Sequence, residues 1–276
     1  MAIIGSGTVV SFPSEPPLPP HEQPPTTPPQ PLVPGKVAPQ RAVIRWGLGD
    51  VLIGLALWLV GGILASIVLI ATGDVSNSSI TELSLGALSI SLVCGWPGFL
   101  GWPIVATYWK GQRSLRLDFG LDIRPIDVAW GLLGGVVALV LSAFGGILWA
   151  LLSRDPSPSN TEFLPTRPSA FTALAIFFLV AICTPIVEEL FFRGLFLRSI
   201  GRRWNLAAGV IISSLVFGLF HAQGDTWGQA AFIVGVTASY GAVFALLVIR
   251  AKGRLGPSIV AHMCVNAVGV LGALYL

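Results

Sequence analysis

Seven long apolar segments constrain this chain more than any other feature of its sequence. They cover roughly residues 47–72, 83–109, 127–152, 169–190, 205–222, 228–249 and 256–275. A stretch of about 18 or more apolar residues can cross the hydrocarbon core of a bilayer as an α-helix. Only 11% of the residues are charged, against about 25% in a typical soluble domain. The sequence therefore predicts an all-α polytopic membrane protein with about seven transmembrane helices.

Basic residues in the loops predict the orientation of these spans. Loops rich in Lys and Arg alternate with loops that contain few or none. Because basic loops stay in the cytoplasm, the N-terminus is predicted to be cytoplasmic and the C-terminus to lie on the other side. In a bacterium this would be the plasma membrane. The net charge of +3 is spread over short loops, so it does not indicate a nucleic-acid partner.

Residues 1–44 are predicted to form a disordered tail before a membrane domain at 45–276. This tail contains more than half of the 21 prolines of the chain. Runs of proline favour an extended polyproline II conformation and exclude helix. The tail could be a flexible spacer, or a docking ligand for a partner that reads proline motifs.

Two adjacent glutamates, Glu188 and Glu189, lie within the apolar segment 169–190. A charged side chain at the bilayer centre is unfavourable by about 2.5–3.5 kcal/mol on insertion scales. Ionisable residues in this position usually belong to a site of chemistry or transport. Glu189 and Arg193 are one helical turn apart and are predicted to form an ion pair. Glu188 points about 100° away and is predicted to be the freer carboxylate.

Three further polar residues occur in the last two-fifths of the chain. His221 ends the segment 205–222, while His262 and Asn266 are four residues apart in the segment 256–275. Asn266 could orient the His262 ring or point at the same substrate atom. Singly, each residue could be a hydrogen-bonded packing residue, and Glu188 alone could couple to an ion or proton. Together with Glu188, they indicate one convergent polar site formed by three spans.

A carboxylate and two imidazoles suit two kinds of hydrolytic chemistry. Glu188, His221 and His262 could bind a divalent metal such as zinc, which would activate water. Alternatively, Glu188 and His221 could activate the water directly, while His262 and Asn266 stabilise the oxyanion. The metal-free form is preferred, because two histidines and one glutamate supply few firm ligands. Both mechanisms give hydrolysis, and a peptide bond is the expected target.

The motifs Glu188-Glu189-x-x-x-Arg193, Phe217-x-x-x-His221 and His262-x-x-x-Asn266 occur in this order. Their pattern resembles the CPBP family of intramembrane proteases, which includes type II CAAX prenyl endopeptidases and bacteriocin-processing and bacteriocin-immunity proteins. The resemblance implies a membrane endopeptidase with a core at about 127–276. It also implies that Glu188 and His221 activate water, that His262 and Asn266 stabilise the oxyanion, and that Glu189 and Arg193 support the site.

The expected substrate is a membrane-associated or lipid-anchored protein or peptide in the bilayer. Two alternatives belong to other classes of protein. One is a non-catalytic immunity or scaffold protein of the same fold, and the other is an ion-coupled transporter, although no internal repeat supports a transporter.

Counting helical rise from the basic loops places the expected site residues at unequal depths. Glu188 would lie about 21 Å from Arg202, whereas His262 would lie only about 12 Å from Arg254. A kink at Pro185, a tilted span, or a dipping segment near 253–257 would be needed to bring them together.

Overall fold

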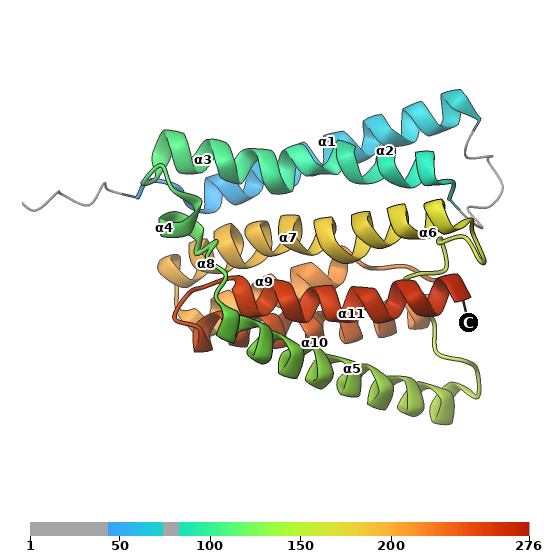
Figure 1. The fold of residues 1–276 in the computed structure, drawn as a ribbon. Helices are drawn as coiled ribbons and strands as arrows, with labels where there is room; N and C mark the ends of the chain where they lie inside the picture. Colours follow the sequence, from blue (N-terminus) through green and yellow to red (C-terminus); the bar gives the residue numbers. More distant parts are fainter. Residues whose placement is uncertain (1–43, 74–82, 276) are drawn as a thin grey trace, which may run out of the picture. The chain divides into compact units, whose positions relative to one another are not determined.

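The computed structural model describes residues 44–73 and 83–275, and its helices follow the apolar segments (Figure 1). The elements in chain order are α1 (Leu48–Thr72), α2 (Leu85–Trp96), η1 (Pro97–Gly101), α3 (Trp102–Lys110), α4 (Leu115–Phe119), α5 (Pro125–Ser153), α6 (Ala170–Ile176), η2 (Phe177–Cys183), α7 (Thr184–Glu189), η3 (Leu190–Phe196), α8 (Leu197–Arg203), α9 (Leu206–Leu219), α10 (Trp227–Arg250) and α11 (Gly256–Tyr275). The segments η1, η2 and η3 are π-helical. Residues 1–43, and with them almost all of the predicted tail, lie outside the described part of the chain.

Six helices in the described ranges are long and apolar enough to cross a membrane. They are α1, the continuous helix 85–110, α5, the continuous helix 170–203, α10 and α11. The predicted fold class, an all-α polytopic membrane protein, is confirmed, and no strand occurs in the ranges that the structure covers.

The predicted span 205–222 differs from the others, because its helix α9 contains only 14 residues. A helix of this length is about 21 Å long, short of the roughly 30 Å hydrocarbon core. The helix ends before a polar turn, in which Gly224 adopts a positive φ of 125°. The helix that contains the predicted span 169–190 is longer than that span, because it continues to Arg203.

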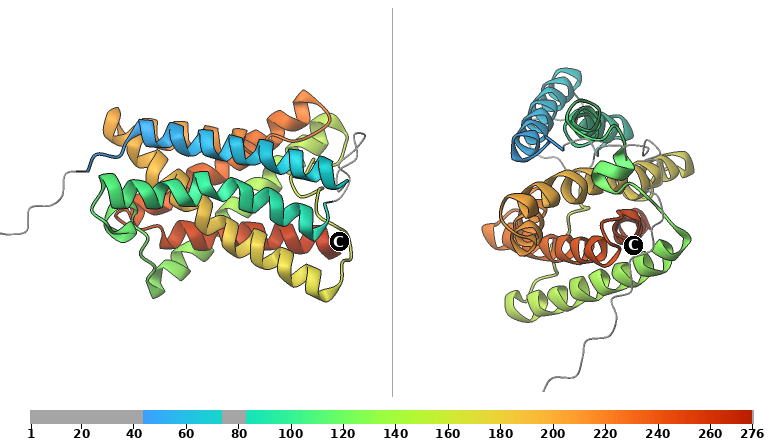
Figure 2. Two further views of the ribbon diagram at one scale, coloured as in Figure 1. Left: turned by 90° about the horizontal axis from the view of Figure 1, so that it is seen from above. Right: turned by 90° about the vertical axis from the view of Figure 1, so that its left-hand side faces the viewer.

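Close helix packing surrounds α11, as the two views in Figure 2 show. Helix α5 packs along α11, α9 packs along α10, and α1 packs along α2. Gly131 and Gly135 let α5 approach closely, because a Cβ atom on Gly135 would lie 2.8 Å from the Cβ atom of Cys264. Small residues allow such approaches in lipid, where packing rather than the hydrophobic effect joins helices.

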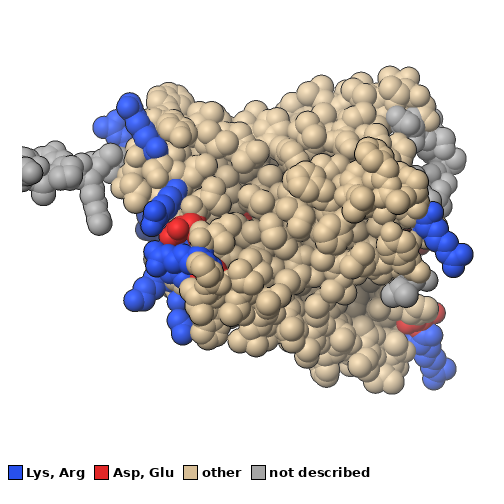
Figure 3. Space-filling model, viewed as in Figure 1, with Lys and Arg blue, Asp and Glu red and all other residues tan. Residues whose placement is uncertain are grey.

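Lys and Arg side chains gather at the end of the bundle where α3, α8 and α10 end (Figure 3). Several of them hold the connecting segments together. Arg198 donates hydrogen bonds to the carbonyl oxygens of Asp118, Phe119 and Gly253, and so joins α8 to α4 and to the α10–α11 turn. Arg202 lies 3.6 Å from the centre of the Trp46 ring. We call this the basic end.

Helix α11 begins inside the protein, which removes the expected mismatch in depth. The Leu255 N–H donates to the Gly120 carbonyl oxygen, and residues 255–259 are all buried. Figure 1 shows that α11 starts further from the basic end than the end of α8. The inward start of α11 carries His262 to the depth of Glu188.

The adjacent glycines of α1 offer a matched test of this packing. A Cβ atom on Gly61 would overlap the Cys94 carbonyl oxygen of α2, whereas one on Gly62 would meet nothing within 4 Å. We expect Gly61→Ala to destabilise the protein by about 1–3 kcal/mol through overpacking. Gly62→Ala should be neutral or stabilising by up to about 1 kcal/mol, because alanine favours helix. Thermal unfolding in detergent would measure both, and equal midpoints would contradict the α1–α2 packing.

Candidate active site

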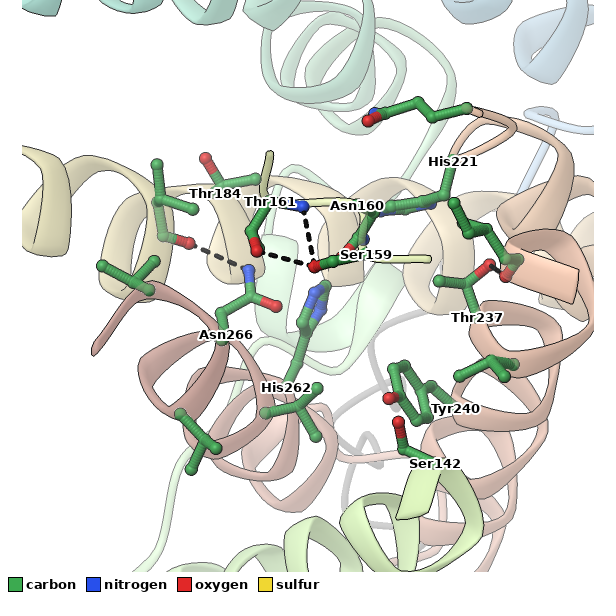
Figure 4. Close-up of a pocket in the computed structure, with 18 of the residues that line it drawn as sticks. Ser142, Ser159, Asn160, Thr161, Thr184, His221, Thr237, Tyr240, His262 and Asn266 are labelled. Carbon is green, nitrogen blue, oxygen red and sulfur yellow. Dashed lines mark hydrogen bonds between the residues drawn. The ribbon is translucent and has the colours of Figure 1, made fainter. Parts of the chain in front are cut away.

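A cavity of about 400 Å³ lies between the helices, and all four residues expected to react line it. They are Glu188 from α7, His221 from the turn after α9, and His262 and Asn266 from α11. Figure 4 shows His262 and Asn266 on one side of this cavity and His221 on another. Its volume lies within the usual range of ligand pockets. The expected convergence of these side chains in one place is therefore present.

Glu188 and His262 lie close to each other on the wall of the cavity. The distance from Glu188 Oε2 to His262 Nε2 is 3.7 Å, and 18% of the Glu188 side chain is exposed. Glu188 Oε2 makes no hydrogen bond to any residue that the structure describes. Glu189 Oε2 also lacks a partner among these residues, so the two glutamates differ in exposure and in the arginine pairing of Glu189. Glu188 is partly exposed and has no arginine partner, which agrees with the prediction that it is the freer carboxylate.

Glu189 is fully buried and holds two partners at once. Its Oε1 atom accepts a 2.9 Å hydrogen bond from Arg193 Nη1 and lies 3.1 Å from His262 Nδ1. The predicted ion pair between Glu189 and Arg193 is thus confirmed, with both side chains at 0% exposure. Glu189, rather than Asn266, makes the hydrogen bond that orients the His262 ring.

Aromatic rings surround the Arg193 guanidinium. Its Cζ atom lies 4.4 Å from the centre of the Phe217 ring and 5.3 Å from that of Phe244. Arg193 Nη2 also donates to the Gly241 carbonyl oxygen at 3.1 Å. Such rings attract a cation through their negative faces. The guanidinium is therefore fixed in place, and it fixes Glu189 in turn.

The buried charges balance only if this group carries one additional proton. Two carboxylates and one guanidinium leave a single negative charge among Glu188, Glu189 and Arg193. An unpaired charge is very unfavourable in a low-dielectric interior. A proton on either His262 or Glu188 removes it. The 3.7 Å between these two side chains is longer than a direct hydrogen bond, so a proton could pass between them only through a bridging water or after a small movement.

Asn266 is held by a carbonyl group that Pro185 leaves free. The Thr184 N–H bonds the Leu179 carbonyl five residues back, in π-helical register. In the same register the next donor would be Pro185, which has no N–H, onto the Val180 carbonyl. Asn266 Nδ2 donates to that Val180 oxygen at 2.9 Å. Pro185 thus lies in α7, directly after the π-helical segment η2, and π-helical segments are often found at functional sites.

His221 has one ring nitrogen engaged and one available. Its Nδ1 lies 2.8 Å from the Phe217 carbonyl oxygen, which can only accept. Nδ1 must therefore carry the hydrogen, so Nε2 has a free lone pair in the neutral ring. The Phe217 and His221 rings are in contact, with their centres 4.7 Å apart.

The residues expected to ligate a metal do not stand together as a ligand set. Among the described residues, no group of three or more His, Cys, Asp or Glu side chains is placed to share a metal ion. Glu188 and His262 form a close pair, and His221 does not join them as a third ligand. Since zinc sites usually take three or four protein ligands, we derive no reaction step through a metal.

Sequence reasoning missed the loop between α5 and α6 as part of the site. Residues 157–161 and Phe163 line the cavity, and the Leu83 N–H donates to the Phe163 carbonyl oxygen. Figure 4 shows Tyr240 and Ser142 facing each other at another side of the cavity. No spacing rule links these residues to the motifs, because they come from separate elements.

The fold and the site define an integral, multi-pass membrane protein with a buried glutamate–histidine site. Residues 170–268 match the family model described as Rce1-like, "Type II CAAX prenyl endopeptidase Rce1-like". This segment is therefore similar to a CAAX-type intramembrane protease domain, which agrees with the expected resemblance to the CPBP family. It contains all three motifs. Comparisons with curated proteins and with solved structures found no match.

The two neighbouring glutamates should differ sharply in their effect on stability. Glu189→Gln leaves a fully buried guanidinium without its counter-charge, so we expect a loss of about 3–5 kcal/mol. Glu188→Gln removes no hydrogen bond of Oε2 to a described residue and should change stability by less than about 1 kcal/mol. Thermal unfolding in detergent would compare them. Equal losses would contradict the division of roles.

A double-mutant cycle tests the link between Pro185 and Asn266. Asn266→Ala leaves the Val180 carbonyl without its partner and should destabilise by about 1–3 kcal/mol. In a Pro185→Ala background a backbone N–H returns, so the same change should cost at least about 0.5 kcal/mol less. Pro125→Ala, at the start of α5, is the control and should be additive with Asn266→Ala. Additivity in the Pro185 cycle as well would refute the link.

Proposed function

We propose that this protein is an intramembrane endopeptidase that hydrolyses a peptide bond with a water molecule activated by glutamate and histidine. The observation that carries the proposal is that Glu188 and His262 form a close pair on the wall of a cavity between the membrane-spanning helices. The Rce1-like segment supports the same class of reaction.

Glu188 is the group proposed to bind and deprotonate the water. A general base must be within reach of the reacting molecule, and Glu188 lines the cavity with 18% of its side chain exposed. His221 would assist through Nε2, since its Nδ1 hydrogen is held by the Phe217 carbonyl oxygen. Both residues line the cavity, so a water molecule there can reach a substrate carbonyl.

His262 and Asn266 are proposed to stabilise the oxyanion. The Asn266 amide has two N–H donors, and only one is needed by the Val180 carbonyl oxygen. His262 can donate from Nε2 when it holds the additional proton of the buried group, while Nδ1 bonds Glu189. Prepositioned donors of this kind typically account for 10²–10³-fold in rate. Glu189 and Arg193 are positioning residues.

The location of the cavity supports one class of substrate. It is bounded by helices that are apolar enough to cross a membrane, together with the α5–α6 loop. This position fits a scissile bond that enters from the bilayer or from its surface. We propose a membrane-associated or lipid-anchored protein or peptide as substrate, with the basic end and the N-terminus facing the cytoplasm.

Substitution of the two proposed water-activating residues tests the function. Glu188→Ala and His221→Ala should each reduce proteolysis of a lipid-anchored reporter peptide by at least about 100-fold. Membrane insertion and yield should remain those of the unaltered protein. Cleavage at the original rate by either variant, in reconstituted vesicles, would refute the mechanism.

Chelator treatment distinguishes the metal-free mechanism from the zinc-assisted one. Because the described donors do not form a group of three, we expect activity to persist after exposure to a strong chelator. Metal analysis of the same purified preparation would accompany the assay. Loss of activity with chelator, followed by recovery with zinc, would contradict the metal-free reaction.

A further inference from the structure

A second cavity lies near the basic end of the molecule, separate from the candidate active site. Its volume is about 310 Å³. It lies among the start of α5, the end of α10 and the start of α11. Its lining residues are Arg124, Ile126, Trp130, Leu247, Arg250, Ala251, Lys252, Arg254 and Pro257. None of them lines the first cavity.

The four cations of this cavity are not fully balanced by carboxylates. Arg254 makes two hydrogen bonds to Asp127, of 2.6 and 3.2 Å, and this contact raises the pKa of Arg254. Arg124 pairs with Asp122 at 3.2 Å. Arg250 and Lys252 have no carboxylate within ion-pair distance in the described part of the chain. Two positive charges therefore remain for an anion.

The positions of these two cations are set by local structure. Arg250 lies 4.6 Å from the centre of the Trp130 ring, so a helix of another span holds its guanidinium. Such a contact leaves the charge of the arginine intact. Lys252 has a positive φ of 56°, which is uncommon for a residue with a side chain. The strained turn keeps Lys252 at the cavity mouth.

Apolar side chains lead away from the same cavity along α5. Ile126, Trp130, Leu133 and Val137 recur at helical spacing on one face, and the first two line the cavity. Ile126, Leu133 and Val137 are exposed to the outside of the bundle. Cations beside such a stripe match an amphiphile that has an anionic headgroup and hydrocarbon chains.

We propose that this second cavity binds the phosphate of an anionic phospholipid, with Arg250 and Lys252 as its principal ligands. The cavity lies where α5 begins and α10 ends, which is the level of the headgroups for spans of this length. Basic pockets between spans are suited to lipid headgroups, and each cation near the surface strengthens binding severalfold. The acyl chains would lie along the exposed stripe of α5.

Lipid titration of the purified full-length chain in neutral detergent tests this proposal. Phosphatidylglycerol should bind and raise the thermal midpoint, whereas phosphatidylcholine should do so much less. The double variant Arg250→Gln/Lys252→Gln should weaken phosphatidylglycerol binding by about thirtyfold. Native mass spectrometry would count the bound lipid directly.

A matched control separates this site from general attraction to a basic surface. Arg45→Gln/Arg203→Gln removes the same charge from exposed residues outside the cavity and should leave binding within about twofold. Equal weakening by both double variants would overturn the proposal. Equal binding of phosphatidylcholine would overturn it too, as would full competition by millimolar inorganic phosphate, because a free phosphate would then be the ligand.

Discussion

The fully buried ion pair between Glu189 and Arg193 is the interaction on which the rest of the site depends. Neither side chain has exposed area, so each must be neutralised by the other. The guanidinium also bonds the Gly241 carbonyl oxygen, and the carboxylate bonds His262. The pair thereby joins three spans, the continuous helix 170–203, α10 and α11. This ion pair, buried within the protein, thus acts as a structural constraint on the cavity.

This constraint leaves Glu188 available for chemistry. With Glu189 paired to Arg193 and fully buried, Glu188 is the partly exposed carboxylate beside His262. The π-helical segment η2, which Pro185 follows, has a related effect. Its register leaves the Val180 carbonyl to Pro185, which has no N–H, so Asn266 is held at the cavity. Local departures from α-helix therefore serve the arrangement of the polar side chains.

Much of the fold could be predicted because apolar length and helical spacing are local properties. The positions of the helices and the contact of Glu189 with Arg193 follow from residues close in sequence. The predicted span 205–222 was longer than the helix α9, because hydropathy does not detect that the helix stops before a polar turn at Gly224. Asn266 was one candidate to orient His262, and the structure assigns that bond to Glu189. The two roles considered for Asn266, orienting the His262 ring and pointing at the substrate, fit the same four-residue spacing, so the spacing could not decide between them.

The sequence by itself determined that the chain crosses a membrane several times and carries an unfavourable pair of glutamates in one span. It also determined which four polar residues would line the cavity. Only the tertiary structure decided which partner each of them has. The bond from His262 to Glu189 joins residues 73 positions apart, and that from Asn266 to Val180 joins residues 86 apart. Such contacts depend on how the spans pack and where α11 begins, and no spacing within one helix encodes them.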